Sequence, residues 1–593
     1  MMGPGETERA GDVLVNIQRV TYTHWNQASP TLREVSLRIK RATLNVLVGP
    51  GGSGKSTLCD LFNGVIPHLS GGSFEGDVWI DGVNTREVEV KDLAPKVGRV
   101  FQDPEIMFAT LFVEDEIAFG PENLRFDVAT ILSVREKLLA DTNLAPRRHH
   151  LVWNLSGGQI QKLGLASVLA MQPQMIVLDE PTSNLDPAAT RNVHEMVLSL
   201  RREGITVLLV TRELDEFLAE ADQLFVMAEG RLVTSGRPHD VLREQGDYMV
   251  DSLGVWLPET SELGIALKRE GLIKGAEIPI TVHETLSMLE REGLLARLGA
   301  DESGLSAVHR STPTIGDILL SGKDLRYAYP GGTEALRGVS LDIRAGDWLM
   351  ILGRNGAGKS TLASMMVGLL RPQHGELVVS GRPIQRWKVQ DLANHIALVF
   401  QNPEHQFLTD SVSDEIGYSL LAHGFSSGPE VERQTGEMLE LLGLRGVADR
   451  HPLALSAGLK RRLGVATMLV GKPQVLLVDE PTYGQDKAMT HTLMALMQEI
   501  RATGVAVVMI THDMRLVQEY AERVVVMSEG VVLYDGPSAG LFDRADILAG
   551  SNLRRTILHE LLAAMRQAGL PFLGEVRRTS DLVDRLRVKD PAE

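Results

Sequence analysis

The chain has 593 residues, which is too long for one hydrophobic core, since domains usually hold about 50 to 250 residues. Apolar residues make up 44% and charged residues 23%, a composition typical of a globular protein rather than a disordered or fibrous one. The formal net charge of -17 argues against nucleic acid as the main partner and against charge-driven docking on anionic lipid, because both need clustered Lys and Arg.

The opening sequence, MMGPGETERAGD, has no basic flank followed by an apolar run, and we find no stretch of about 18 apolar residues. We therefore expect a protein that is neither secreted nor membrane-spanning. The single cysteine, Cys59, cannot form an intramolecular disulfide and lies on the apolar face of an expected helix. It is predicted to be a small core residue in a reducing compartment rather than a reactive thiol.

Strand-like segments open the chain, at residues 13–20 and 32–39, and a third apolar strand then leads into a Gly-rich turn and a helix. Farther along come apolar runs of the kind that form buried parallel strands: IVLDE and VLLVT, then LLVDE and VVMIT. The predicted fold class is α/β.

Several distinct motifs occur twice in the same order, which indicates duplication of a whole domain rather than a short-period repeat. The pairs are GPGGSGKS (49–56) with GRNGAGKS (353–360), VFQDPE (100–105) with VFQNPE (399–404), and MIVLDEPT (175–182) with VLLVDEPT (475–482).

The repeat predicts five regions. They are a flexible N-terminus (1–12), a first domain (13–240), an accessory segment and linker (241–315), a second domain (316–540) and a C-terminal accessory segment (541–593). A purely flexible linker is the alternative for the middle region, but amphipathic pieces such as residues 282–295 favour helices.

Each G-x-x-x-x-G-K-S motif follows a strand and opens a helix, which is the context of a phosphate-binding loop. Its glycines let backbone N–H groups turn toward phosphate oxygens, and the helix N-terminus adds a favourable dipole. Lys55 and Lys359 are expected to reach the β- and γ-phosphates, and Ser56 and Ser360 to ligate Mg²⁺. The other candidate ATP contacts are Gly49, Gly51, Gly52, Gly54, Thr57, Gly353, Asn355, Gly356, Gly358 and Thr361.

Two acids stand at the end of one apolar strand in each copy. Asp179 and Asp479 are candidates to hold Mg²⁺, and Glu180 and Glu480 to act as general bases for the attacking water. Gln102 and Gln401, each after Val-Phe, are candidates to sense both Mg²⁺ and that water. A pair of surface carboxylates is the alternative interpretation.

The segment LSGGQ, residues 155–159, separates this sequence from other proteins with phosphate loops. With it, the chain resembles the ATP-binding cassette (ABC) ATPases, and both repeats carry the resemblance over most of their length. The resemblance implies two domains, each with a RecA-like parallel core, an antiparallel β subdomain and a helical subdomain. It also implies that the two domains dimerise within one chain, head to tail, so that ATP lies between one phosphate loop and the other domain's signature segment.

A finer resemblance links VFQDPEIMFATLFVEDEIAFGPENL (100–124), TVHETLSML (281–289) and RTSDLVDRL (578–586) to the ATPases of energy-coupling factor (ECF) importers. These importers take up vitamins, vitamin precursors or transition-metal ions. The resemblance implies an ATP- and Mg²⁺-dependent ATPase that is peripheral to the cytoplasmic face of a bacterial membrane. Its partners would be integral membrane subunits for coupling and substrate binding.

The family pattern makes the two sites unequal. For the second phosphate loop it supplies Tyr329 to stack on adenine, Gln401, Glu480 and His512, together with Ser156, Gly157, Gly158, Gln159 and Asp186 from the first domain. For the first loop, His24 stands in place of Tyr329, with Trp25 beside it, and Arg212 stands in place of His512. The facing segment there is LSAGL (455–459), with Ser456, Ala457, Gly458 and Leu459, followed by Asp486.

We therefore expect the second site to do most of the hydrolysis and the first mainly to hold ATP. The alternative is harmless drift with two working sites, since Glu180 and Gln102 are retained. For the whole protein, the alternatives are a soluble tandem cassette protein acting on ribosomes or DNA, or the ATPase of an exporter. The transported substrate cannot be read from this chain.

Overall fold

The computed structural model describes residues 12–25, 27–182, 187–212, 214–275, 277–296, 316–425, 428–482, 485, 487–570 and 576–587. It divides into two compact units, Met1–Leu294 and Leu295–Glu593, and each is considered by itself. No helix in the described ranges has the length and apolar character needed to cross a bilayer.

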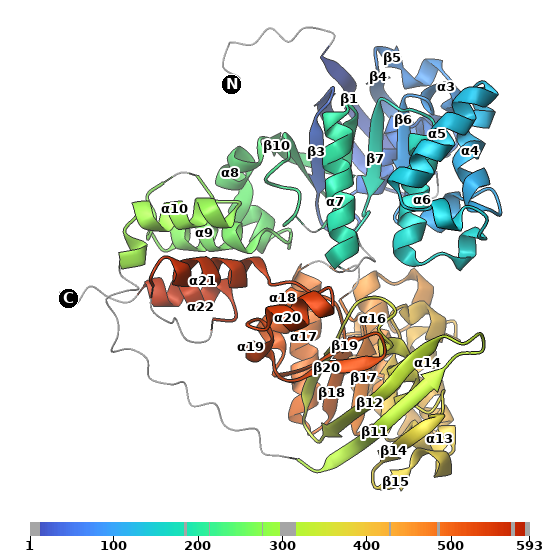
Figure 1. The fold of residues 1–593 in the computed structure, drawn as a ribbon, viewed down its shortest axis with the longest axis vertical. Helices are drawn as coiled ribbons and strands as arrows, with labels where there is room; N and C mark the ends of the chain where they lie inside the picture. Colours follow the sequence, from blue (N-terminus) through green and yellow to red (C-terminus); the bar gives the residue numbers. More distant parts are fainter. Residues whose placement is uncertain are drawn as a thin grey trace. The chain divides into compact units, whose positions relative to one another are not determined.

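The first unit begins with a four-stranded antiparallel sheet in the order β2-β1-β4-β5 (Figure 1). Along β2 every inward side chain is buried and the neighbours are more exposed, as expected for a sheet with one covered face. The strands are β1 Val13–His24, β2 Leu32–Lys40, β4 Gly72–Ile80 and β5 Val83–Asn84.

A second, six-stranded sheet has the order β10-β9-β3-β8-β7-β6 and is parallel except for β10. Its central strands are buried along their whole length, which confirms the prediction made from their apolar runs. The strands are β3 Leu44–Val48, β6 Val97–Val100, β7 Met175–Asp179, β8 Thr206–Val210, β9 Gln223–Ala228 and β10 Arg231–Gly236.

Helices cover both faces of this sheet. On one face, α1 (Lys55–Phe62) packs with the antiparallel sheet, and Cys59 is buried in that core as predicted. On the other, α7 (Pro187–Arg202) shares a core with alternate residues of the same strands. The short helices of this part are α2 Val65–His68 and α3 Val90–Leu93.

Three helices inserted between β6 and β7 form a separate helical region with its own small core. They are α4 Val113–Asn123, α5 Val128–Asp141 and α6 Gly157–Leu169. The signature segment LSGGQ therefore leads into a helix, α6, whose N-terminus is exposed.

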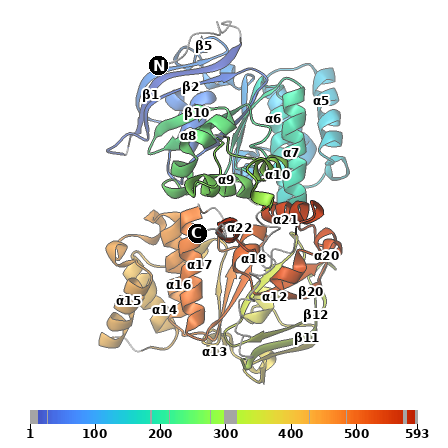
Figure 2. The same ribbon diagram turned by 90° about the vertical axis from the view of Figure 1, so that its left-hand side faces the viewer.

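The accessory segment of the first unit consists of α8 Pro238–Asp251, α9 Glu259–Arg269 and α10 Val282–Arg291, which lie near β10 (Figure 1 and Figure 2). Met249, Leu257 and Ile278 belong to the same core as the parallel sheet, so the described residues 238–275 and 277–280 are packed structure rather than a flexible linker. The amphipathic piece 282–295 forms α10 up to Arg291, then a turn in which Gly293 has a left-handed φ of 70°, and residues 294–296 are helical again.

The second unit repeats this plan. Its antiparallel sheet has the order β12-β11-β14-β15 and its parallel sheet the order β16-β17-β18-β13-β19-β20. The strands are β11 Ile318–Ala328, β12 Glu334–Arg344, β13 Trp348–Leu352, β14 His374–Val379, β15 Arg382–Pro383, β16 Ile396–Val399, β17 Val475–Asp479, β18 Ala506–Ile510, β19 Arg523–Ser528 and β20 Val531–Pro537.

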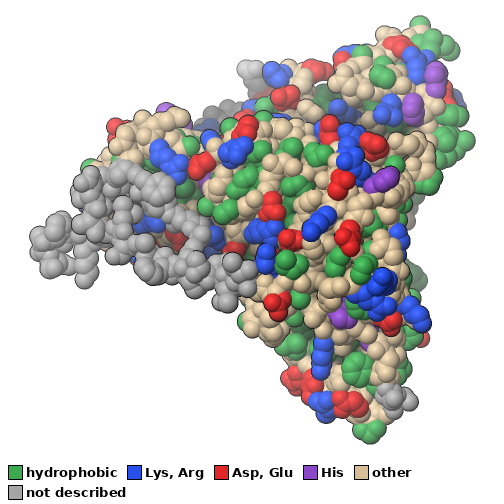
Figure 3. All heavy atoms as spheres, turned by 60° about the horizontal axis from the view of Figure 1, so that its bottom comes forward, with side chains coloured by type: hydrophobic (Ala, Val, Ile, Leu, Met, Phe, Trp, Pro, Cys, Tyr) green, Lys and Arg blue, Asp and Glu red, His purple; other side chains and the backbone are tan. Residues whose placement is uncertain are grey.

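Most helices of the second unit have counterparts in the first, but α18 does not, since residues 215–220 form turns. The helices are α12 Lys359–Met366, α13 Val389–Leu392, α14 Val412–Ala422, α15 Pro429–Leu441, α16 Ala457–Leu469, α17 Lys487–Ala502 and α18 Met514–Tyr520, and then α19 Ser538–Leu541, α20 Ala545–Gly550, α21 Ile557–Gln567 and α22 Thr579–Leu586 in the tail. On the face shown in Figure 3, basic and acidic side chains are interspersed.

Candidate functional site

The first phosphate loop, residues 49–56, joins the central strand β3 to α1. Gly54 is the N-cap of α1 with a left-handed φ of 96°, which side chains other than glycine rarely adopt. At Gly49 an added Cβ would lie 2.2 Å from the carbonyl oxygen of Met227 in β9, so the loop passes too close to the sheet for any larger residue. Lys55 Nζ donates to the carbonyl oxygens of Gly49 and Pro50, at 2.8 and 2.9 Å, and so lies across the loop.

A cavity of about 640 Å³ opens over this loop. It gathers most of the residues predicted for the first site: Gly51, Gly52, Gly54, Lys55, Ser56, Thr57, Gln102, Asp179, Glu180 and Arg212. His24 also lines it, whereas Trp25 is 83% exposed. Residues from four separate strand ends thus meet at the carboxyl edge of the parallel sheet, where ligands bind in open α/β sheets.

Both acids of the first site are paired with an arginine. Glu180 Oε1 accepts from Arg212 Nε at 2.9 Å, and Asp179 Oδ2 accepts from Arg99 Nη2 at 3.0 Å. Arg99 also pairs with Asp60 of α1. Sequence reasoning missed Arg99 and Asp60, although an arginine inside the strand VGRV is unusual enough to have signalled them.

Burial sets the protonation of this site. It raises the pKa of the Glu180 carboxyl, and the positive charges of Arg212 and Lys55 only partly offset the effect. It lowers the pKa of Lys55, with Glu180 acting in the opposite direction. Burial thus works against the charged form of both groups, and the opposite charges within the site work in favour of it.

The second phosphate loop, residues 353–360, has the same geometry. Gly358 caps α12 with a φ of 99°, and Lys359 Nζ donates to the carbonyl oxygens of Gly353 and Arg354, at 2.6 and 3.1 Å. The hydroxyl of Tyr329 lies 3.2 Å from Oγ1 of Thr361, so the predicted adenine-stacking residue is next to the loop.

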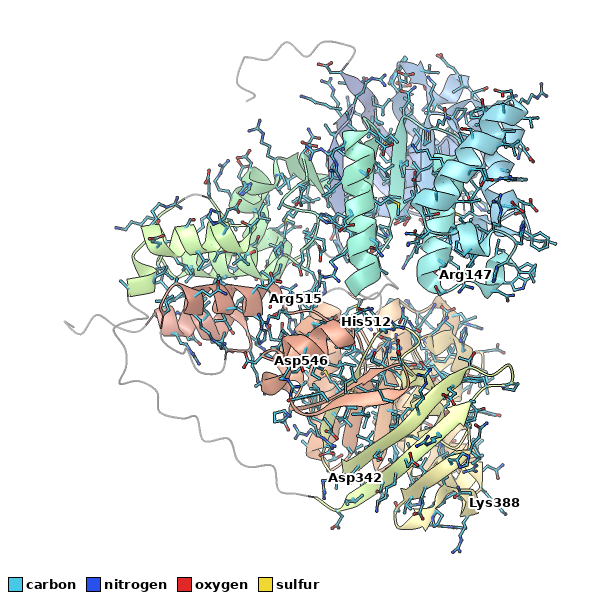
Figure 4. All side chains as sticks on the ribbon, in the orientation of Figure 1. Arg147, Asp342, Lys388, His512, Arg515 and Asp546 are labelled. Carbon is cyan, nitrogen blue, oxygen red and sulfur yellow. The ribbon has the colours of Figure 1, made fainter. Side chains whose placement is uncertain are left out.

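The acids of the second site have different neighbours. His512 Nδ1 lies 2.8 Å from Oε1 of Glu480. This histidine, labelled in Figure 4, follows β18 and precedes α18 in the chain. Burial and the charge of Glu480 raise the pKa of Asp479 to about 6. Glu180 and Glu480 both have a left-handed φ, 49° and 45°, and strained backbone of this kind concentrates at functional sites.

A side chain from the signature helix touches the strand-end glutamine in each unit. In the second, Arg461 of α16 donates to the carbonyl oxygens of Phe400 and Gln401, both at 2.7 Å. In the first, Gln161 of α6 makes one longer contact, 3.4 Å, to the carbonyl of Gln102. Sequence reasoning did not single out Arg461 or Gln161.

The two signature segments also differ at their helix starts. The N–H of Ser156 donates to Oε1 of Gln159 at 3.0 Å, which closes a capping box at the start of α6. The residue of α16 that aligns with Gln159 is Leu459, whose side chain has no hydrogen-bond acceptor and cannot close such a box. Asp186 and Asp486 lie outside the described residues.

The donors at both sites suit Mg²⁺, a hard cation that prefers oxygen ligands and is usually held by one or two carboxylates together with phosphates. The first cavity brings together oxygens of Ser56, Gln102 and Asp179. Among the described residues no cluster of three or more His, Cys, Asp or Glu forms a cage for a metal on its own. The raised pKa of Asp479 shows buried negative charge that a cation would offset.

Two phosphate loops, each at the carboxyl edge of a parallel sheet and each with an Asp-Glu pair beside it, define a tandem P-loop ATPase. The sequence model of the ABC transporter family matches residues 32–183 and 336–483. The chain belongs to the ABC transporter family and carries two copies of its ATP-binding domain.

Two relatives agree with this assignment. The "Putative ABC transporter ATP-binding protein" of Methanosarcina mazei is 36% identical over 95% of this chain and 95% of its own. The "Putative HMP/thiamine import ATP-binding protein YkoD" of Bacillus subtilis is 34% identical over 94% of this chain and 97% of its own. The solved structure of CbiO1 from Clostridium perfringens, part of the ABC transporter complex CbiONQ, has 32% identity and a TM-score of 0.37, covering 42% of this chain and 99% of that one. The family model and the two relatives identify this chain as an ATP-binding, ATP-hydrolysing protein of a transporter.

Proposed function

We propose that the chain is the energy-coupling ATPase of an ECF-type importer for a vitamin, a vitamin precursor or a transition-metal ion. Two features support the proposal. The segment 100–124 and the accessory helices carry the ECF resemblance, and the Bacillus subtilis relative, similar over nearly the whole chain, is named for HMP and thiamine import. In this proposal the chain works at the cytoplasmic face of a bacterial membrane, bound to integral membrane subunits for coupling and for substrate binding. The proposed domains are 13–240 and 316–540, followed by accessory segments 241–315 and 541–593.

The second-domain site is proposed to do most of the hydrolysis. The observation that carries this is the difference in partners of the two proposed bases: Glu480 has His512, whereas Glu180 is held by the permanent charge of Arg212. Arg212 stays protonated and can only donate to Glu180, whereas the imidazole of His512 can also accept a proton, so only the second base has a partner able to take part in proton transfer.

In the proposed reaction, Lys359 and the N–H groups of residues 353–360 bind the β- and γ-phosphates, and Tyr329 stacks on the adenine. Ser360, Gln401 and Asp479 would hold Mg²⁺, which offsets charge on the phosphate oxygens when bound. Glu480 orients a water and accepts its proton while the water oxygen bonds to the γ-phosphorus and the bond to the β-phosphate oxygen breaks. His512 holds the Glu480 carboxylate in position.

Following the family pattern, the first domain's Ser156, Gly157, Gly158 and Gln159 are proposed to complete the second site, and Ser456 and Gly458 the first. The described residues support one part of this. A Cβ added to Gly157 would meet no described atom within 4 Å, so the chain's own packing does not demand glycine there. A ligand that approaches closely would demand it, and the aligned residue at the other segment is Ala457.

The test compares Glu480→Gln with Glu180→Gln in the transporter assembled with its membrane subunits. Each change removes one proposed base and leaves the side-chain shape. We expect Glu480→Gln to lower the ATPase rate by roughly 10²-fold or more, and Glu180→Gln to lower it by less than about threefold. Equal losses would overturn the asymmetry. Import of a vitamin or metal ion into liposomes, with ATP inside, tests the importer assignment separately.

A further inference from the structure

The first unit has a buried arginine, Arg99, beside Asp179, the acid proposed to hold Mg²⁺. The second unit has no arginine at the aligned position. Arg99 lies in β6 with a side chain only 5% exposed, and its Nη2 donates to Asp179 Oδ2 at 3.0 Å. The aligned residue of β16 is Leu398. Among the residues that the structure describes, Asp479 has no ion-pair partner, so one of the two aspartates is paired and the other is not.

A second residue differs together with Arg99. The other end of the guanidinium pairs with Asp60 of α1, the helix that starts from the phosphate loop. The aligned residue in α12 is Ser364. Arg99 therefore links the phosphate-loop helix to the end of β7, and the second unit has neither half of this link.

Arginine suits this position because its planar fork can bond two carboxylates at once and stays charged when buried. The guanidinium also lies 4.5 Å from the centre of the Phe101 ring, a favourable cation–π contact that holds it in place. Arg461, the buried arginine of the second unit, bonds instead to the carbonyls of Phe400 and Gln401 and leaves Asp479 without such a bond.

The charge balance at the two sites then differs in a way that affects a divalent cation. A carboxylate oxygen that already accepts a hydrogen bond from an arginine is a poorer metal ligand, because the metal must displace that bond or share the oxygen. The same arginine offsets the negative charge of Asp179, which would otherwise repel the phosphates of a nucleotide bound without metal.

We propose that Arg99 is a specificity-determining residue that lowers the first site's affinity for the divalent cation and lets this site retain nucleotide without it. The second site, with Leu398 and Ser364, needs the cation to hold nucleotide. This inference deepens the proposed function, since it rests on the first site being one that mainly holds ATP.

Binding of Mn²⁺, measured by electron paramagnetic resonance on the full chain saturated with a non-hydrolysable ATP analogue, tests the proposal without measuring activity. The unmodified chain is expected to bind Mn²⁺ with two affinities that differ by about tenfold to hundredfold, the range of one charge-assisted hydrogen bond. The double variant Arg99→Leu with Asp60→Ser installs the second unit's own residues. It is expected to bring the weak affinity to within about threefold of the tight one.

The reciprocal double variant, Leu398→Arg with Ser364→Asp, is the matched control. It is expected to weaken Mn²⁺ binding at the second site, the one with the higher affinity. Retention of labelled ATP in excess EDTA gives a second readout. We expect one nucleotide per unmodified chain to be retained, and Arg99→Leu with Asp60→Ser to lose it. Thermal unfolding checks that each variant folds, and if one does not, the other still decides the question.

Two equal Mn²⁺ affinities in the unmodified chain, or affinities that neither double variant changes, would overturn the role of Arg99. That result would leave the asymmetry of hydrolysis standing if Glu480→Gln and Glu180→Gln still differ. Conversely, equal losses in those two variants with unequal Mn²⁺ affinities would overturn the proposed asymmetry of hydrolysis and keep the role of Arg99 in metal binding.

Discussion

Replacing His512 with arginine would give the second site the residue that the first site has. The two contacts are nearly the same length, 2.8 Å from His512 Nδ1 to Glu480 Oε1 and 2.9 Å from Arg212 Nε to Glu180 Oε1, so the change alters charge more than position. Loss of one preorganised transition-state contact costs about 3 kcal/mol, and at about 1.36 kcal/mol per tenfold this is roughly a 150-fold loss of rate. We therefore expect His512→Arg to retain about 1% of the ATPase rate.

The assay is the steady-state ATPase rate of the assembled transporter, measured together with equilibrium binding of ATP. Binding is expected to change by less than about threefold, because the phosphate loop and Tyr329 are untouched. Arg212→His is the matched control. It should raise the rate by less than about threefold, since the first site's other differences from the family pattern remain.

The reasoning would be refuted by a His512→Arg variant that keeps more than about a third of the rate, since no single transition-state contact would then have been lost. A large gain from Arg212→His would refute it too, because the first site would then be limited by that arginine alone.

Three further outcomes follow from particular contacts. Gln159→Leu removes the acceptor for the Ser156 N–H, so the free energy of unfolding in urea titrations should fall by about 1 kcal/mol, as is usual for a helix cap. A decrease below about 0.3 kcal/mol would show that Gln159 does not stabilise this helix start. Burial lowers the pKa of His559 from 6.5 to about 4, so between these values the unfolded chain binds a proton that the folded chain excludes, and stability should fall as the pH drops from about 6.5 to 4. His559→Gln should flatten this slope in thermal unfolding, and an unchanged slope would assign it to other groups. Tyr329→Ala should raise the KM for ATP with little effect on kcat, because stacking on the adenine stabilises the ground state and the transition state equally. A fall in kcat with an unchanged KM would argue against the stacking role.

The phosphate loops were predictable from sequence because their chemistry is local. A glycine with left-handed φ, a following lysine and a helix start lie within eight residues, so the order of residue types implies the geometry found at Gly54 and Gly358. The buried strands were predictable for the same reason, since four or five consecutive apolar residues before an acid match strands such as β7 and β17. The amphipathic pattern of 282–295 indicated helix, but it could not show the turn at residues 292–293, because such a pattern continues across Gly293 without revealing its backbone conformation.

By itself, the sequence determined that this chain is a duplicated ATP-binding cassette, that its two signature segments differ, and that Arg212 and His512 occupy equivalent positions. The tertiary structure decided which partner each acid has. Arg99, Asp60 and Asp179 are far apart along the chain and meet only because β6 pairs with β7 while α1 packs against the same sheet. Strand pairing, not motif spacing, places that arginine against the aspartate, and a motif search has no means of detecting such a contact.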